Sequence, residues 1–107
     1  MVAMDPLEVV LRELRPVLQA RKARAAYLIG SRARGTAHPT SDIDLIVVSE
    51  SDRPAVERFK DYLAAIVASP VGVDLLGYTP EEFDRMVEEK RPFLEHALKG
   101  ARLVYEG

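Results

Sequence analysis

Short apolar runs alternate with amphipathic segments along the chain, and this alternation constrains the fold more than any other feature. The runs at 25–29, 43–48 and 71–78 have the length of strands, and the middle one is rich in β-branched residues. A closing run at 101–105 is expected to form an edge strand. Strands that alternate with helices predict an α/β (α+β) domain, a small mixed sheet of three to four strands covered by helices.

The segments between these runs carry the start signals of helices. Asp5 can cap the first helix, and Pro16 is expected to kink or shorten it. Thr79 and Glu82 have the spacing of a capping box ahead of a later helix. Between these two, a helix that starts near Pro54 is expected to bury an apolar side made of Val56, Phe59, Leu63, Ile66 and Val67.

A chain of 107 residues is expected to be a single domain, 1–107, with one core. It has no cysteine, no signal-peptide pattern and no apolar run near the ~18 residues of a membrane helix, which predicts a cytoplasmic protein without membrane contact. A formal net charge of −2 argues against direct binding of nucleic acid as the main function. A sheet this small leaves strand edges exposed, so a homo- or hetero-oligomer is expected.

Two carboxylates stand close together at the start of the second strand run. Asp42 and Asp44 are two residues apart, and side chains two apart on a strand point to the same face. Ile43, between them, points to the opposite, buried face. Neighbouring carboxylates repel unless a cation lies between them, and hard divalent ions such as Mg²⁺ accept this ligand set. The alternative is a strand start that simply faces water.

Gly30 and Ser31 end the first strand run, ahead of a short helical segment. A helix N-terminus presents unpaired N–H groups and binds phosphate, and here the glycine would let the backbone approach while the serine adds a hydroxyl. Arg32 and Arg34 add positive charge to the same segment. The alternatives are a plain tight turn, and arginines that are solvated or paired with acids.

A third acid interrupts the apolar run at 71–78. Asp74 alternates with Gly72 and Leu76 along one side of that run. An ionised carboxylate is costly to bury unless it is paired or binds a metal, and a strand-edge pair with an arginine is the simpler alternative. Three strand carboxylates beside a phosphate-binding turn fit a site for two metal ions that stabilise a phosphoryl displacement.

A composite motif joins these residues: Gly-Ser-Arg-Ala-Arg-Gly at 30–35, Ser-Asp-Ile-Asp-Leu at 41–45, and Asp74. This motif resembles the signature of the polymerase-β-like nucleotidyltransferase superfamily, and most closely that of its minimal nucleotidyltransferases. The resemblance covers most of the chain and is strongest over 27–48 and 71–78. It implies the small nucleotidyltransferase fold.

By this resemblance, the chain transfers a nucleoside monophosphate, AMP from ATP, to a hydroxyl acceptor with the help of two Mg²⁺ ions. Gly30 and Ser31 would hold the triphosphate, and Arg32 and Arg34 would steady phosphates. Asp74 would also help to deprotonate the acceptor hydroxyl. The residues implied to bind metal and to act in catalysis are Asp42, Asp44 and Asp74.

The resemblance also implies a partner. Short proteins of this kind are often encoded beside a HEPN-domain toxin, and the nucleotidyltransferase acts as antitoxin by adenylylating a tyrosine of that toxin. One alternative is a non-catalytic nucleotide-binding antitoxin that neutralises or scaffolds its partner by contact. Another is transfer to a small molecule, as in aminoglycoside nucleotidyltransferases, which carry an additional helical domain for the acceptor.

The two histidines lie outside the composite motif. His38 precedes a proline in a loop and His96 adjoins Glu95 in a helical segment, so both are expected at the surface. The histidines are far apart in the sequence and cysteine is absent, so a zinc site is not expected.

Overall fold

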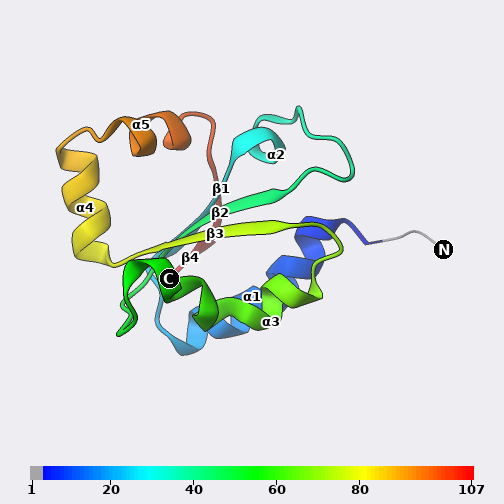
Figure 1. The fold of residues 1–107 in the computed structure, drawn as a ribbon, viewed down its shortest axis with the longest axis horizontal. Coiled ribbons are helices and arrows are strands. Elements are labelled where there is room, and N and C mark those ends of the chain that lie inside the picture. Colours follow the sequence, from blue (N-terminus) through cyan, green and yellow to red (C-terminus); the bar gives the residue numbers. More distant parts are fainter. Residues whose placement is uncertain (1–3) are drawn as a thin grey trace.

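Four strands form one mixed sheet in the order β3-β2-β1-β4 in the computed structural model, which describes residues 4–107 (Figure 1). β1 pairs antiparallel with β2 and β4, whereas β2 and β3 run parallel. The strands are β1 Ala25–Ile29, β2 Ile43–Val48, β3 Val73–Tyr78 and β4 Arg102–Glu106. The predicted α/β class and the positions of the strands are confirmed.

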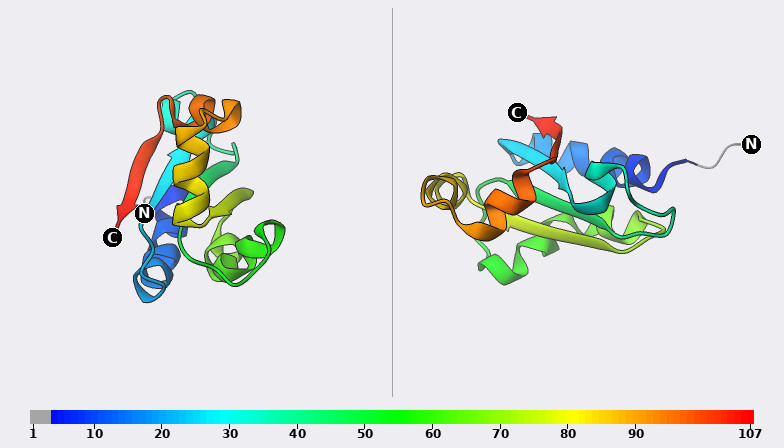
Figure 2. Two further views of the ribbon diagram at one scale, coloured as in Figure 1. Left: turned by 90° about the vertical axis from the view of Figure 1, so that its left-hand side faces the viewer. Right: turned by 90° about the horizontal axis from the view of Figure 1, so that it is seen from above.

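Helices cover both faces of this sheet. α1 and α3 lie side by side against one face, and α4 and α5 lie against the other face toward one end of the strands (Figure 1, Figure 2). Their bounds are α1 Pro6–Ala20, α2 Gly30–Arg34, η1 Ala55–Tyr62, α3 Leu63–Ala68, α4 Pro80–Glu88 and α5 Pro92–Leu98. Within residues 4–107, no helix has the length and apolar character needed to cross a membrane.

The central strand β2 is apolar on both faces. Ile43 and Leu45 pack in the cluster beneath α1 and α3, whereas Ile46 and Val48 pack in the cluster beneath α4 and α5. Full burial of each such side chain contributes about 1.5–3 kcal/mol, so β2 anchors both layers. Asp44 is the acid of this strand and is only partly buried.

Helix α1 continues through Pro16 to Ala20, so the expected shortening at this proline is wrong. Pro16 is exposed, which leaves the carbonyl that loses its N–H partner on the solvent side. Leu14 and Leu18 are fully buried on either side of it and hold the helix against the core. Tertiary packing thus outweighs the local effect of the proline. The predicted cap is present, since Asp5 Oδ1 accepts from the backbone N–H of Leu7 at 2.8 Å.

The segment after Pro54 turns a different side inward than expected. Val56 and Val67 are 83% and 79% exposed, and Phe59 and Leu63 are exposed as well. The buried residues of the segment are Arg58, Tyr62 and Ala65. The segment starts as the 3₁₀ helix η1, and polar contacts made on its inner side fix its orientation. Of the predicted apolar face, only Ile66 packs against the core, and the other four residues form a surface.

Arg58 makes these polar contacts and joins η1, β3 and α4. Its guanidinium donates to the carbonyl oxygens of Arg53 and Gly77, at 3.1 and 3.2 Å, and to both carboxylate oxygens of Glu82. The Glu82 carboxylate also accepts from the backbone N–H of Thr79 at 2.9 Å, which completes the predicted capping box. One buried arginine therefore ties the end of β3 to the start of α4.

The same contacts make stability depend on pH. The hydrogen bond from Arg58 holds the pKa of Glu82 below its ordinary value of 4.5. A carboxylate whose pKa is lower in the folded state stabilises the fold above its unfolded pKa, and this contribution is lost as pH falls through the lowered value. Below about pH 4.5, we expect the free energy of unfolding of Glu82→Gln to fall less steeply than that of the wild type in urea titrations.

The matched control is Glu81→Gln, because Glu81 is an exposed acid of the same helix that forms a surface ion pair with Arg85. Glutamine at position 82 keeps a capping-box side chain, so the comparison isolates the charge. If the free energy of unfolding of the wild type and of Glu82→Gln fell equally steeply at low pH, Glu82 would not be the source of this pH dependence.

Candidate active site

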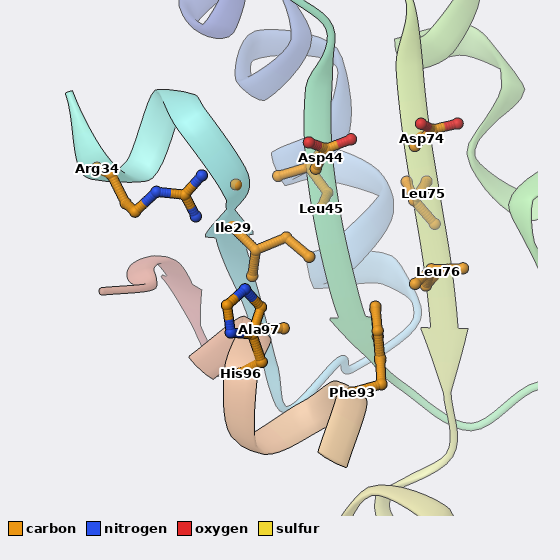
Figure 3. Close-up of a pocket in the computed structure, with 11 residues that line it drawn as sticks. Ile29, Arg34, Asp44, Leu45, Asp74, Leu75, Leu76, Phe93, His96 and Ala97 are labelled. Carbon is orange, nitrogen blue, oxygen red and sulfur yellow. The ribbon is translucent and has the colours of Figure 1, made fainter. Parts of the chain in front are cut away.

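Two carboxylates meet across the parallel strands β2 and β3. Asp44 and Asp74 are paired in register, and neighbouring strands lie ~4.8 Å apart. Leu45 and Leu75, the next residue of each strand, belong to the core cluster beneath α1 and α3. Figure 3 shows both carboxylates at one end of a pocket. The fold thus brings together two of the three acids that the sequence singles out.

Asp42 lies just before β2 and is exposed. Its carboxylate rests over Gly72, because a Cβ at Gly72 would come within 2.6 Å of Asp42 Oδ1. The backbone N–H of Ile43 donates to the carbonyl of Gly72 at 2.8 Å, which fixes this close approach. Asp42 stands at the flank of the pocket rather than in its lining, and its charge still acts on Asp44.

The negative charges of Asp42 and Asp74 repel that of Asp44. Burial raises the pKa of Asp44, and the charges of Asp74 and Asp42 and a hydrogen bond with Asp74 raise it further. A divalent cation held by these carboxylates would remove the repulsion, and carboxylate oxygens are the ligands that Mg²⁺ prefers. Within residues 4–107, no three acidic or histidine side chains are already gathered as a metal cluster. The paired carboxylates, with Asp42 beside them, are the part that fits magnesium.

Gly30 brings the end of β1 against Asp44. Its φ is +74°, and a Cβ there would come within 2.5 Å of Asp44 Oδ2. Any other residue would both strain this backbone and collide with the carboxylate. Gly30 lines the pocket, and Ser31 follows it in α2, partly exposed. The predicted phosphate turn therefore adjoins the predicted metal ligands.

The two arginines of α2 point to different places. The Arg32 guanidinium donates to the carbonyl oxygens of Pro39 and Ser41, at 3.0 and 2.7 Å. These bonds order the loop that leads into Asp42. Arg34 instead lines the pocket, and Figure 3 shows its guanidinium directed into it. Only Arg34 is placed where a phosphate in the pocket would meet it.

The pocket has a volume of about 490 Å³ and a second wall that the sequence did not reveal. Phe93, His96 and Ala97 of α5 form this wall. Their spacing places them on one face of a helix, but nothing in the sequence indicates that this face meets β2 and β3. His96 is exposed, as expected, yet it faces the pocket; His38 is exposed in its loop and lies outside the lining.

A family model described as the nucleotidyltransferase domain matches residues 11–99, which is most of the chain. The chain belongs to the nucleotidyltransferase domain family. The matched range spans the acids at 42, 44 and 74 and the turn at 30–31, and it includes all of α5. No curated protein sequence matches this nucleotidyltransferase domain significantly.

Solved structures share the fold of this nucleotidyltransferase domain. A minimal nucleotidyltransferase is 26% identical with a TM-score of 0.58, over 95% of this chain and 98% of that chain. A toxin-antitoxin solved with AMP-PNP is 19% identical with a TM-score of 0.63. The match covers 90% of this chain and 73% of that chain. Spectinomycin adenyltransferase AAD(9) from Enterococcus faecialis, solved with ATP and spectinomycin, is 14% identical with a TM-score of 0.61. The match covers 95% of this chain and 55% of that chain. The nucleotidyltransferase fold is confirmed.

Proposed function

We propose that this domain is a Mg²⁺-dependent nucleotidyltransferase that moves AMP from ATP to a hydroxyl of a protein partner. One observation supports this most. Asp44 and Asp74 are paired in register across β2 and β3, and Gly30 packs so closely against Asp44 that no side chain fits between them. The proposed metal ligands and the turn proposed to bind phosphate therefore adjoin in one pocket.

In this proposal each residue has a separate task. Mg²⁺ held by Asp44 and Asp74, with Asp42 beside them, would neutralise the phosphates and stabilise the charge that develops during phosphoryl transfer. Gly30 lets the backbone approach the triphosphate, with the hydroxyl of Ser31 next to it. The Arg34 guanidinium, directed into the pocket, balances the charge of the phosphates.

The reaction is a displacement at the α-phosphorus of ATP. A bond forms between the acceptor oxygen and this phosphorus, and the bond to the pyrophosphate oxygen breaks. The proton of the acceptor hydroxyl passes to Asp74, which is exposed on its strand and so is accessible to an incoming acceptor. Pyrophosphate leaves, and AMP remains on the acceptor.

The proposed acceptor is a tyrosine of a HEPN-domain toxin, and the domain acts as the cytoplasmic antitoxin of that pair. The structural likeness to a toxin-antitoxin solved with AMP-PNP supports this choice. The likeness to an adenyltransferase solved with spectinomycin keeps a small-molecule acceptor as the competing outcome of the test.

The test is transfer of label to a co-expressed HEPN-domain protein, the proposed partner. We expect label from ATP marked at the α-phosphate, but not at the γ-phosphate, to appear on the partner in Mg²⁺ and to be lost in EDTA. Changing the acceptor tyrosine of the partner to phenylalanine removes the label. A variant with both Asp42→Ala and Asp44→Ala is expected to be inactive.

Two results would contradict the proposal. Equal transfer by the Asp42→Ala, Asp44→Ala variant would exclude the metal mechanism. A variant without transfer that still protects cells from the toxin would instead favour neutralisation by contact, with the nucleotide serving only to stabilise the complex.

A further inference from the structure

The pocket has two chemically different ends. Asp44 and Asp74 lie at one end, and the side chains of Phe93 and His96 from α5 lie at the other (Figure 3). Leu76 continues the pocket wall along β3 from Asp74. Residues two apart on a strand share a face, so Leu76 lies ~7 Å beyond Asp74 on the same side of the sheet.

Two large apolar side chains are left open in this pocket. Phe93 is 50% exposed and Leu76 is 41% exposed, although apolar residues of this size stabilise a fold by about 1.5–3 kcal/mol when buried. They come from elements far apart in the sequence, α5 and β3, and both face the same cavity. The fold thus holds an apolar slot, defined by Phe93 and Leu76, next to the carboxylates.

We propose that this slot takes the nucleobase of the nucleoside triphosphate, by stacking on the ring of Phe93, and that the domain accepts purine nucleotides as a class. The inference rests on the proposed function, because it requires a nucleotide whose α-phosphate lies at Asp44 and Asp74. The nucleoside is attached directly to that phosphate, so its base must lie within one ribose of the carboxylates. The slot is the apolar surface at that position, whereas the acceptor is not tethered and approaches from solvent.

The lining also predicts how the base is read. Among the pocket side chains of residues 4–107, His96 is the one polar group at the slot end. The other side chains there are Ile29, Leu76, Phe93 and Ala97. A site that hydrogen-bonds a substrate discriminates by about 10⁴-fold or more, whereas an apolar site discriminates by about 10- to 200-fold. Stacking favours the larger purine ring over a pyrimidine but separates ATP from GTP poorly.

The test is calorimetric binding of ATP, GTP, CTP and tripolyphosphate in Mg²⁺, with the wild type and Phe93→Ala. For the wild type we expect ATP and GTP to agree within about tenfold, and both to bind more tightly than CTP and tripolyphosphate. Phe93→Ala is expected to weaken ATP and GTP by about tenfold or more and to leave tripolyphosphate unchanged. The matched control is Leu103→Ala, which removes an equally exposed side chain, also at 50%, from β4 outside the pocket.

The outcomes separate this inference from the proposed function. A wild type that binds neither ATP nor tripolyphosphate would overturn both. A wild type that binds tripolyphosphate as tightly as ATP, or that prefers ATP to GTP by more than about 200-fold, would overturn the inference alone. The same holds if Phe93→Ala weakens tripolyphosphate as much as ATP, which would mark a structural role, or if it raises only the KM of the acceptor.

Discussion

Replacing Asp44 with asparagine is expected to abolish nucleotidyl transfer and, at the same time, to stabilise the fold. Asparagine keeps the shape of the side chain but removes the charge that would bind Mg²⁺, so we expect transfer to fall by at least about a thousandfold. The carboxylate of Asp44 is partly buried beside Asp74 and Asp42, and its pKa is raised by burial and by their charges. Removing this charge relieves the repulsion in the metal-free domain.

The expected gain in stability is about 0.5–1 kcal/mol, the size of a cross-strand charge pair at a partly exposed position. It is measured as the free energy of unfolding at neutral pH in EDTA. Mg²⁺ is expected to raise the Tm of the wild type and not that of Asp44→Asn, because a ligand stabilises only the folded state that binds it.

The matched control for this experiment is Asp84→Asn. Asp84 is an exposed acid paired with Arg24 at 2.6 Å, outside the pocket. We expect its loss to leave transfer unchanged and to lower the free energy of unfolding only slightly, because an exposed ion pair contributes little. An Asp44→Asn variant that retains transfer would show that the charge of Asp44 is not needed to bind Mg²⁺. A variant less stable than the wild type in EDTA would contradict the repulsion among the three acids.

The strands and part of the site could be predicted because they depend on local patterns. The runs that became β1 and β2 are short, apolar and bounded by turn residues, and the chain's alternation of strands and helices predicted the sheet class. The period of two also placed Asp44 opposite the buried Leu45. The register that pairs Asp44 with Asp74 is a contact between residues thirty positions apart, and no local pattern specifies it.

Other features depend on which partner each segment meets. The stripe from Val56 to Val67 has the spacing of a buried helix face, but the hydrogen bonds of Arg58 turn the opposite side inward. Nothing in the sequence indicates that the face of α5 with Phe93 and His96 lines a pocket. It does so because the fold places this face across from β3. Arg32 and Arg34 look equivalent in the sequence. Their roles differ in the structure because the loop carbonyl oxygens accept hydrogen bonds from Arg32.

Replacing Arg58 with alanine is expected to be the most destabilising single change outside the apolar core. The variant removes four hydrogen bonds at once, to Arg53, to Gly77 and to the two oxygens of Glu82. Breaking a buried pair costs about 3–5 kcal/mol, but the Glu82 side chain is 39% exposed and can regain water. We therefore expect a loss of about 2 kcal/mol, which lowers the Tm by roughly 10 °C in a domain of this size.

Arg85→Ala provides the control, because it removes the same side chain from an exposed i,i+4 pair with Glu81. That pair is expected to contribute no more than about 0.5 kcal/mol. Arg58 holds the end of β3, the strand that carries Asp74 and Leu76, to η1 and α4. If Arg58→Ala lowered the Tm no more than Arg85→Ala does, the hydrogen bonds of Arg58 would not stabilise the orientation of η1. Apolar packing alone would then fix η1.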